Sequence, residues 1–113
     1  MPRLTTLRAG YPFDRVFNEG KFTVKENMSL HFVGNGTGQS RFGFAVSTRI
    51  KRAVERNLLR RRMKEIARQL ESVKPGYDIV FLLRERNDDS LEGLRRKMMY
   101  LLENRGLLLE AAE

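Results

Sequence analysis

The run from Tyr77 to Leu83 constrains the fold of this chain more than any other stretch, because it is apolar at nearly every position. Such a run is typical of a strand at the centre of a sheet that is covered on both faces. The residues Lys74-Pro75-Gly76 stand before it and end any preceding helix. A chain of 113 residues, 41% of them hydrophobic, is long enough for one compact domain and too short for two, so we expect a single domain over residues 1–113.

Two more strands are predicted ahead of this run. Residues 22–33 are strand-like, and their second half alternates in polarity. The alternation places Met28, Leu30 and Phe32 on one face and Ser29 and His31 on the other. A glycine-rich turn over residues 34–38 follows, and because another strand begins at once, we expect this turn to be a hairpin loop.

The strand from Arg41 to Ser47 has one bulky face and one small face. Its bulky side chains, which need a core, are Phe42, Phe44 and Val46. Gly43 and Ala45 point the other way, and their small size would let another group approach the sheet closely.

Three helices are predicted from apolar spacing. A short helix over Tyr11 to Gly20 carries Phe13, Val16 and Phe17 at helical spacing, and its glycine offers a stop. From about Lys51 to Leu70 an apolar stripe follows the helical period, formed by Leu59, Met63, Ile66 and Leu70. The last helix is capped by Asp89 or Ser90, with an expected buried stripe of Leu91, Leu94, Met98 and Leu101. These elements predict one α/β sandwich.

The net charge of +8 is concentrated in one quarter of the chain. Between Arg41 and Arg68 there are ten basic residues and two acidic ones, and the rest of the sequence is neutral in sum. Within the long helix a one-sided row repeats at i, i+4 and consists of Arg56, Arg60, Lys64 and Arg68. Like charges at this spacing repel one another, so the row indicates an external polyanion.

Composition argues against several other classes of protein. No apolar run approaches the roughly 20 residues of a membrane-spanning helix, and no apolar segment of a secretory signal follows the first residues. Cysteine is absent, which excludes disulfides and thiolate metal sites and fits a reducing cytoplasm. With one histidine and one local acidic pair, Asp88-Asp89, the sequence shows no active site of its own and no metal site.

Four stretches in register resemble the bacterial ribonuclease P protein family. The central one is Val46-Ser47-Thr48-Arg49 followed by residues 53–61 and Lys64-Glu65. Phe13, Val16, Phe17 and Gly20 resemble the family's N-terminal motif, and Arg41-Phe42-Gly43 and Asp78-Ile79-Val80 resemble two of its strands. The resemblance extends from about residue 7 to residue 100.

Leu58 departs from the family pattern, which usually has arginine there. Leucine cannot contact phosphate, so no RNA-binding role is carried over to it. Because Leu58 lies near Val54 and far from the apolar stripe, we expect it to cover a small cluster beneath the N-terminal segment. Arg61 or Arg62 is a candidate substitute for the missing arginine.

The resemblance implies a two-layer α+β sandwich like the second domain of a small-subunit ribosomal protein. In that fold the basic helix lies in a left-handed β-α-β crossover, whereas general topology rules favour the right-handed form. It also implies two partners, ribonuclease P RNA and precursor tRNA, bound by one copy of the protein without a membrane. The protein would help a catalytic RNA remove the 5′ leader of precursor tRNA, with Mg²⁺ held through the RNA and no cofactor on the protein.

Two sets of residues follow from this resemblance. The set that would bind the catalytic RNA is Arg49, Lys51, Arg52, Arg56, Asn57, Arg60, Arg61, Lys64 and Arg68. The set that would line a cleft for the single-stranded leader is Phe13, Phe17, His31, Gly43 and Ala45. Arginine suits phosphate through its planar fork, and aromatic rings stack on unpaired bases.

Purely structural interpretations of these residues are also possible. The basic row could be a solvated helix face, both phenylalanines could be ordinary core residues, and a lone histidine is usually an unremarkable surface residue. A general RNA-binding or ribosomal-type protein of the same fold, with no role in tRNA processing, is the alternative function. A basic amphipathic helix on a membrane surface fits less well, because the apolar stripe is needed to cover the sheet.

Overall fold

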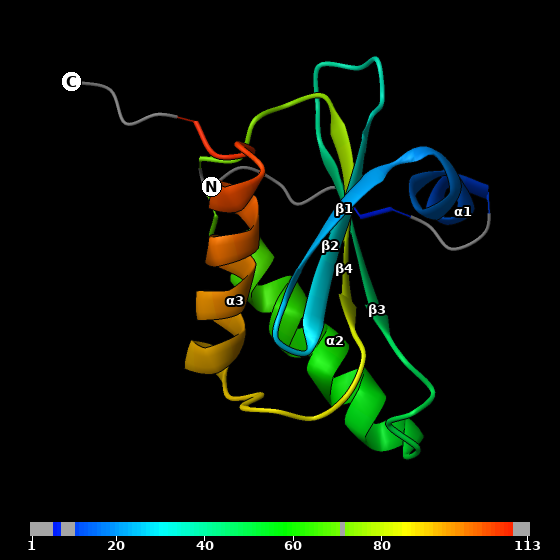
Figure 1. Ribbon diagram of the computed structural model, residues 1–113, viewed down its shortest axis with the longest axis vertical. Coiled ribbons are helices and arrows are strands. Elements are labelled where there is room, and N and C mark those ends of the chain that lie inside the picture. Colours follow the sequence, from blue (N-terminus) through cyan, green and yellow to red (C-terminus); the bar gives the residue numbers. More distant parts are fainter. Residues whose placement is uncertain (1–5, 8–10, 71, 110–113) are drawn as a thin grey trace.

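The computed structural model describes residues 6–7, 11–70 and 72–109. It consists of a four-stranded sheet and three helices (Figure 1). In chain order the elements are α1 (Tyr11–Glu19), β1 (Lys21–Lys25), β2 (Met28–Gly34), β3 (Arg41–Val46), α2 (Ala53–Arg68), β4 (Tyr77–Leu83) and α3 (Leu91–Asn104). Within the described residues no helix is long and apolar enough to span a membrane.

The predicted central strand is confirmed. The strands lie in the order β1-β2-β4-β3, so β4 is hydrogen-bonded on both edges. It runs antiparallel to β2 and parallel to β3. The parallel pair is joined through α2, which makes the β-α-β crossover that the resemblance implied.

The predicted hairpin between the second and third strands is wrong, because β4 lies between β2 and β3. The loop after β2 instead packs on the start of β4. The backbone N–H of Asn35 donates to the carbonyl of Gly76 at 2.9 Å, and its side chain donates to Asp78 at 3.0 Å. A strand whose two faces are both apolar is more stable in the interior of the sheet than at its edge, because both faces are then covered.

The single strand predicted over residues 22–33 is in fact a hairpin. β1 and β2 pair antiparallel around a turn at Glu26 and Asn27, where Glu26 has a positive φ of 55°. Glutamate is not a residue that favours this conformation, so Asn27 is the one residue of the turn whose type favours turns.

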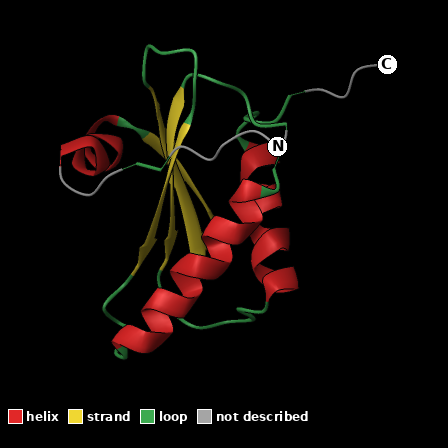
Figure 2. Ribbon diagram, turned by 180° about the vertical axis from the view of Figure 1, so that it is seen from behind, coloured by secondary structure: helices red, strands yellow, loops and turns green. Residues whose placement is uncertain are grey.

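The sheet separates a large core from a small one (Figures 1 and 2). α2 and α3 cover one face, where Leu30, Phe81 and Met98 are among the fully buried residues of the main cluster. α1 lies over the other face, where Leu7, Val16 and Val80 form a second cluster. The protein is therefore an α+β sandwich of sheet and two helices, with α1 added on the opposite face.

The predicted helical stripes are confirmed with one exception. In α2, Leu59, Met63 and Ile66 are buried and Leu70 packs against the same core. Ser90 caps α3 by accepting a hydrogen bond from the N–H of Gly93 at 3.0 Å. Leu91 was expected in the α3 stripe but is 51% exposed, because it is the first residue of the helix and lies a turn before the buried residues begin.

Candidate nucleic-acid interface

The nine residues assigned to the first surface lie on α2 and on the loop before it, and are called the α2 basic surface below. Five of their side chains make no ion pair or side-chain hydrogen bond with any described residue: Arg49, Lys51, Arg52, Arg61 and Lys64. The first four of these are exposed and Lys64 is half-buried. No carboxylate among the described residues therefore neutralises their charge, and a bound polyanion could supply the missing counter-charge.

The other members have partners within the protein. Arg56 is half-buried, and its guanidinium donates to the carbonyls of Ile50 and Lys51 at 2.7 and 2.8 Å, so it holds the loop that carries Lys51. Arg60 donates to the side-chain oxygen of Asn57 at 2.6 Å. Within the part of the chain that the structure describes, Arg68 alone of this set is paired with a carboxylate, that of Glu65 at 3.2 Å, and both side chains are about half exposed. Such a surface pair is weak, so Arg68 could exchange it for a phosphate.

The expectation for Leu58 is wrong. Leu58 is 38% exposed and Val54 is 73% exposed, so neither covers a cluster beneath the N-terminal segment. Both lie on the outer side of α2, whose buried side chains all face the sheet and α3. Arg62 is not free to replace the missing arginine, because it donates to the carbonyl of Asp89 at 2.8 Å. Of the two candidates, Arg61 alone has an unpartnered side chain.

The five residues of the predicted cleft come together between α1 and the sheet. The rings of Phe13 and Phe17 are 5.7 Å apart, and the rings of Phe17 and His31 are 4.7 Å apart. A Cβ atom at Gly43 would lie 2.5 Å from the ring of Phe13, so this ring rests directly on the strand. Ala45 packs in the same cluster as Phe13. The small face of β3 thus accommodates the ring of Phe13, which extends from α1.

Phe13 and Phe17 differ in how much of each ring is available. Phe13 is half-buried and packs against the small core, which favours a largely structural role. Phe17 is 38% exposed and is therefore the better stacking surface of the two.

His31 is held in a defined position and charge state. Its Nε2 atom is 2.9 Å from the hydroxyl of Ser29. Burial, and next the nearby charge of Arg84, hold the pKa of His31 below its usual value. The ring is therefore uncharged near neutral pH and is suited to stacking.

Phe22 was not predicted from the sequence as a member of this site. Its ring stacks on that of His31, with centroids 5.6 Å apart and planes 22° apart, and its side chain is 62% exposed. Phe22 faces His31 because the two residues are partners in the β1–β2 register. Recognising the turn at Glu26 would have revealed this pairing.

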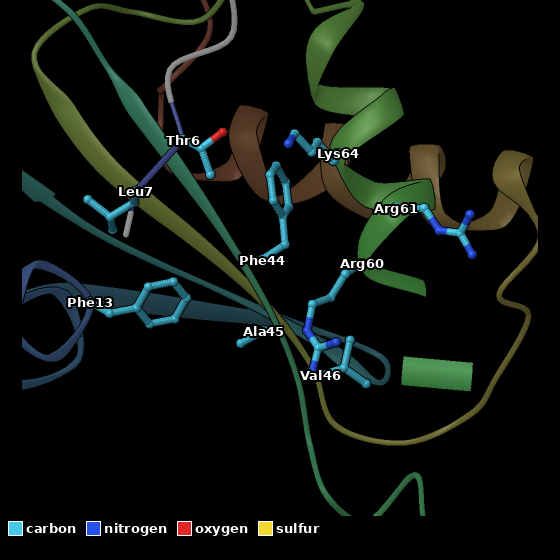
Figure 3. Close-up of a pocket in the computed structure, with 9 residues that line it drawn as sticks. All are labelled: Thr6, Leu7, Phe13, Phe44, Ala45, Val46, Arg60, Arg61 and Lys64. Carbon is cyan, nitrogen blue, oxygen red and sulfur yellow. The ribbon is translucent and has the colours of Figure 1, made fainter. Parts of the chain in front are cut away.

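A groove of about 470 Å³ connects the cleft with the α2 basic surface (Figure 3). It is lined by Thr6, Leu7, Phe13, Phe44, Ala45, Val46, Arg60, Arg61 and Lys64. In Figure 3, β3 runs between Phe13 on one side and the three basic residues on the other. β3 is one of the two edge strands of the sheet, and on its outer side the backbone N–H of Leu7 donates to the carbonyl of Phe42 at 2.6 Å, so the groove lies along an edge that Thr6 and Leu7 partly cover. A single extended ligand could thus contact both surfaces.

Replacing Gly43 with alanine should destabilise the protein by about 1 kcal/mol, near the lower end of overpacking costs. The new methyl group would press on the ring of Phe13 at 2.5 Å and on Val80 at 3.2 Å, and the ring can move only by lifting from the strand. Urea unfolding measures the loss. Gly38→Ala is the matched control, because no atom lies within 4 Å of a Cβ there. Equal stability of the two variants would show that packing of the Phe13 ring does not require the absence of a side chain at position 43.

Comparisons with known proteins bear on the family and the fold. The family model described as Ribonuclease P matches residues 1–105. A ribonuclease P protein component of Pelotomaculum thermopropionicum is 38% identical over 85 residues, covering 74% of this chain and 76% of the relative. The solved RNase P protein of Thermotoga maritima superposes with a TM-score of 0.76 at 32% identity, covering 88% of this chain and 96% of the other. That of Staphylococcus aureus has a TM-score of 0.82 at 18% identity, covering 94% and 99%, and supports the fold.

Proposed function

The chain belongs to the ribonuclease P protein family, and on this premise we propose how its two surfaces serve the role of RNA-binding subunit in tRNA processing. The α2 basic surface binds the RNA partner of the holoenzyme, and the cleft beside α1 binds the single-stranded 5′ leader of precursor tRNA. The observation that carries the proposal is the α2 basic surface, five of whose side chains have no partner among the described residues, connected by one groove to the aromatic cleft. A folded RNA supplies the phosphates for the first surface, and an unpaired strand supplies exposed bases for the second.

The division of chemistry between protein and RNA is also part of the proposal. The described residues contain no group of three or more His, Cys, Asp or Glu side chains that could hold a metal ion. This supports a scheme in which the reacting groups and Mg²⁺ belong to the RNA subunit. The cations of α2 would lower the repulsion between phosphates, so that metal ions and substrate bind the RNA more tightly. One protein would bind one RNA, in the cytoplasm.

Reconstitution tests this function directly. The protein is added to a bacterial ribonuclease P RNA at a low Mg²⁺ concentration, where the RNA alone is slow, and removal of the 5′ leader is followed. Faster processing is the expected result. A general RNA-binding protein of the same fold would bind the RNA without accelerating the reaction.

Replacing Phe17 with alanine should weaken binding of precursor tRNA to the holoenzyme about tenfold, since stacking contributes ~1–3 kcal/mol per base. Binding of mature tRNA should not change, because it has no leader to stack. Dissociation constants of both tRNAs measure the effect. Leu91→Ala is the control, as it removes a similarly exposed apolar side chain at the start of α3. Equal losses for the two tRNAs would assign Phe17 to folding instead.

A further inference from the structure

The sheet face that carries α1 is only partly covered. α1 packs over β2 and β4, and beyond it β1 leaves two large apolar side chains open, Phe22 at 62% and Val24 at 42% exposed. Both point to the same side as His31, because Phe22 pairs with His31 and Val24 pairs with Ser29 in the strand register. Neighbouring exposed apolar side chains of this kind mark a contact surface more often than isolated ones do.

The rings on this face form a continuous row. It begins at Phe13, passes through Phe17 and His31, and ends at Phe22, with neighbouring centroids 5.7, 4.7 and 5.6 Å apart. The first two rings come from a helix, whereas the last two are fixed by the hydrogen-bonded ladder of β1 and β2. Phe22 is the most exposed ring of the row, and one of its faces is already packed on His31. Its remaining exposed surface is free to stack.

A cation on the same face acts on His31 in this row. Arg84 directly follows β4, and alternation along the strand places it on the same face as Leu82 and Val80. Because Val80 pairs with His31, this is also the face of His31. The charge of Arg84 acts on His31. Its half-buried side chain makes no ion pair or hydrogen bond with any described residue. An arginine in this state is a ready partner for phosphate.

We propose that Phe22 and Arg84 form an additional subsite for unpaired RNA, which extends the part of the leader that contacts Phe17 and His31. A base stacks on the exposed surface of Phe22, and a phosphate of the same strand pairs with Arg84. The charge of this corner selects RNA as the occupant, because a purely apolar partner would leave the half-buried guanidinium without a counter-ion. This subsite rests on the proposed function, since it lengthens the strand that the cleft binds.

The test uses reconstituted holoenzyme and a series of precursor tRNAs with leaders of one to about ten nucleotides, a range that covers typical single-strand sites. For the unaltered protein, affinity should rise with leader length to a plateau. Phe22→Ala should reach its plateau at a shorter leader and lose about fivefold affinity for long leaders, with no loss for the shortest ones. The affinity of Arg84→Gln should reach its plateau at the same leader length as that of Phe22→Ala. Its slope of log affinity against log salt should be lower by about 0.7, the value for one single-strand phosphate contact.

Controls separate stacking from bulk and from folding. Phe22→Leu keeps an apolar side chain and should behave like Phe22→Ala, whereas Phe22→Tyr should restore the full profile. Val24→Ala removes an exposed apolar group from the same strand and face and should leave the profile unchanged. Thermal unfolding should be the same for all five variants, since Phe22 is mostly exposed.

The outcomes also distinguish the subsite from the function on which it rests. An unchanged length profile in Phe22→Ala, together with lost leader dependence in Phe17→Ala, overturns the subsite and leaves the function in place. If Phe22→Ala and Phe17→Ala both keep the leader dependence of the unaltered protein, the subsite and the proposed function are both wrong. If Phe22→Ala alters only the sedimentation of the free protein, the patch joins two copies of the chain and the subsite is wrong.

Discussion

Replacing Lys97 with methionine is expected to lower the free energy of unfolding by about 3 kcal/mol, the upper part of the range for leaving buried polar groups unpaired. Lys97 lies on α3 and is fully buried. Its ammonium donates to the side-chain oxygen of Asn27 at 2.6 Å and to the carbonyls of Asn87 and Asp88. Methionine has a similar length and no donor, so the buried side-chain oxygen of Asn27 and the part-buried carbonyls of Asn87 and Asp88 lose their donor.

The effect should be large because Lys97 anchors a loop with several further contacts. Asn27 also donates to the carboxylate of Asp89 at 3.2 Å, and this carboxylate is paired with Arg86 at 2.6 Å. Arg86 in turn reaches Glu55 on the first turn of α2 at 3.0 Å. The loop between β4 and α3 therefore connects both helices to the turn of the β1–β2 hairpin.

Urea unfolding with an unchanged m-value measures this loss. Lys21→Met is the control, since Lys21 is exposed and should change stability by less than about 0.5 kcal/mol. Removing a buried charge can also be favourable, because the ammonium no longer has to leave water. A stability equal to or above that of the unaltered protein would mean that this desolvation term outweighs the three hydrogen bonds.

The elements with a complete periodic pattern could be predicted from the sequence. β4 is recognisable because both of its faces are apolar, and the stripe of α2 because Leu59, Met63 and Ile66 follow the helical period over the whole element. Strand order could not be predicted. Insertion of β4 between β2 and β3 depends on contacts between residues far apart in the chain, whereas the 34–38 turn suggests a local pairing.

Most residues of the candidate site could be predicted from the sequence, but the contacts between them could not. The cations of α2 and the aromatic residues of α1 are visible in the sequence because their spacing is local. Phe22 was missed because its partner His31 lies across a turn whose positive φ falls on Glu26, a residue with no turn preference. The structural use of Arg56 and Arg62 was also invisible, because both donate to backbone carbonyls, which any sequence provides.

Lys97 shows the same limit for the core. A lysine in an amphipathic helix is normally expected on the solvent side. Here the side chain is buried because the loop from Asn87 to Asp89 folds over it and presents carbonyl oxygens. The sequence contains no pattern that assigns backbone acceptors to a particular lysine.

Neutralising three cations of the α2 basic surface together, as Arg60→Gln, Arg61→Gln and Lys64→Gln, should have the largest effect on RNA binding. These residues line the groove, and none of them is paired with a carboxylate among the described residues. Each phosphate contact releases condensed counter-ions and contributes about fivefold in affinity near 0.15 M salt, so three lost contacts amount to about 100-fold. The slope of log affinity against log salt should fall by about 2 to 3.

The matched control removes the same charge from the α3 side of the molecule. Lys25 lies over the ring of Tyr100, Arg105 over that of Phe32, and Arg95 donates to Gln69, so none of the three lines the groove. Their triple glutamine variant should bind ribonuclease P RNA with a nearly unchanged salt slope. Binding of the two triple variants is compared over a salt titration at constant Mg²⁺. If both lose affinity equally, the RNA responds only to net charge, and the alignment of cations along α2 has no role of its own.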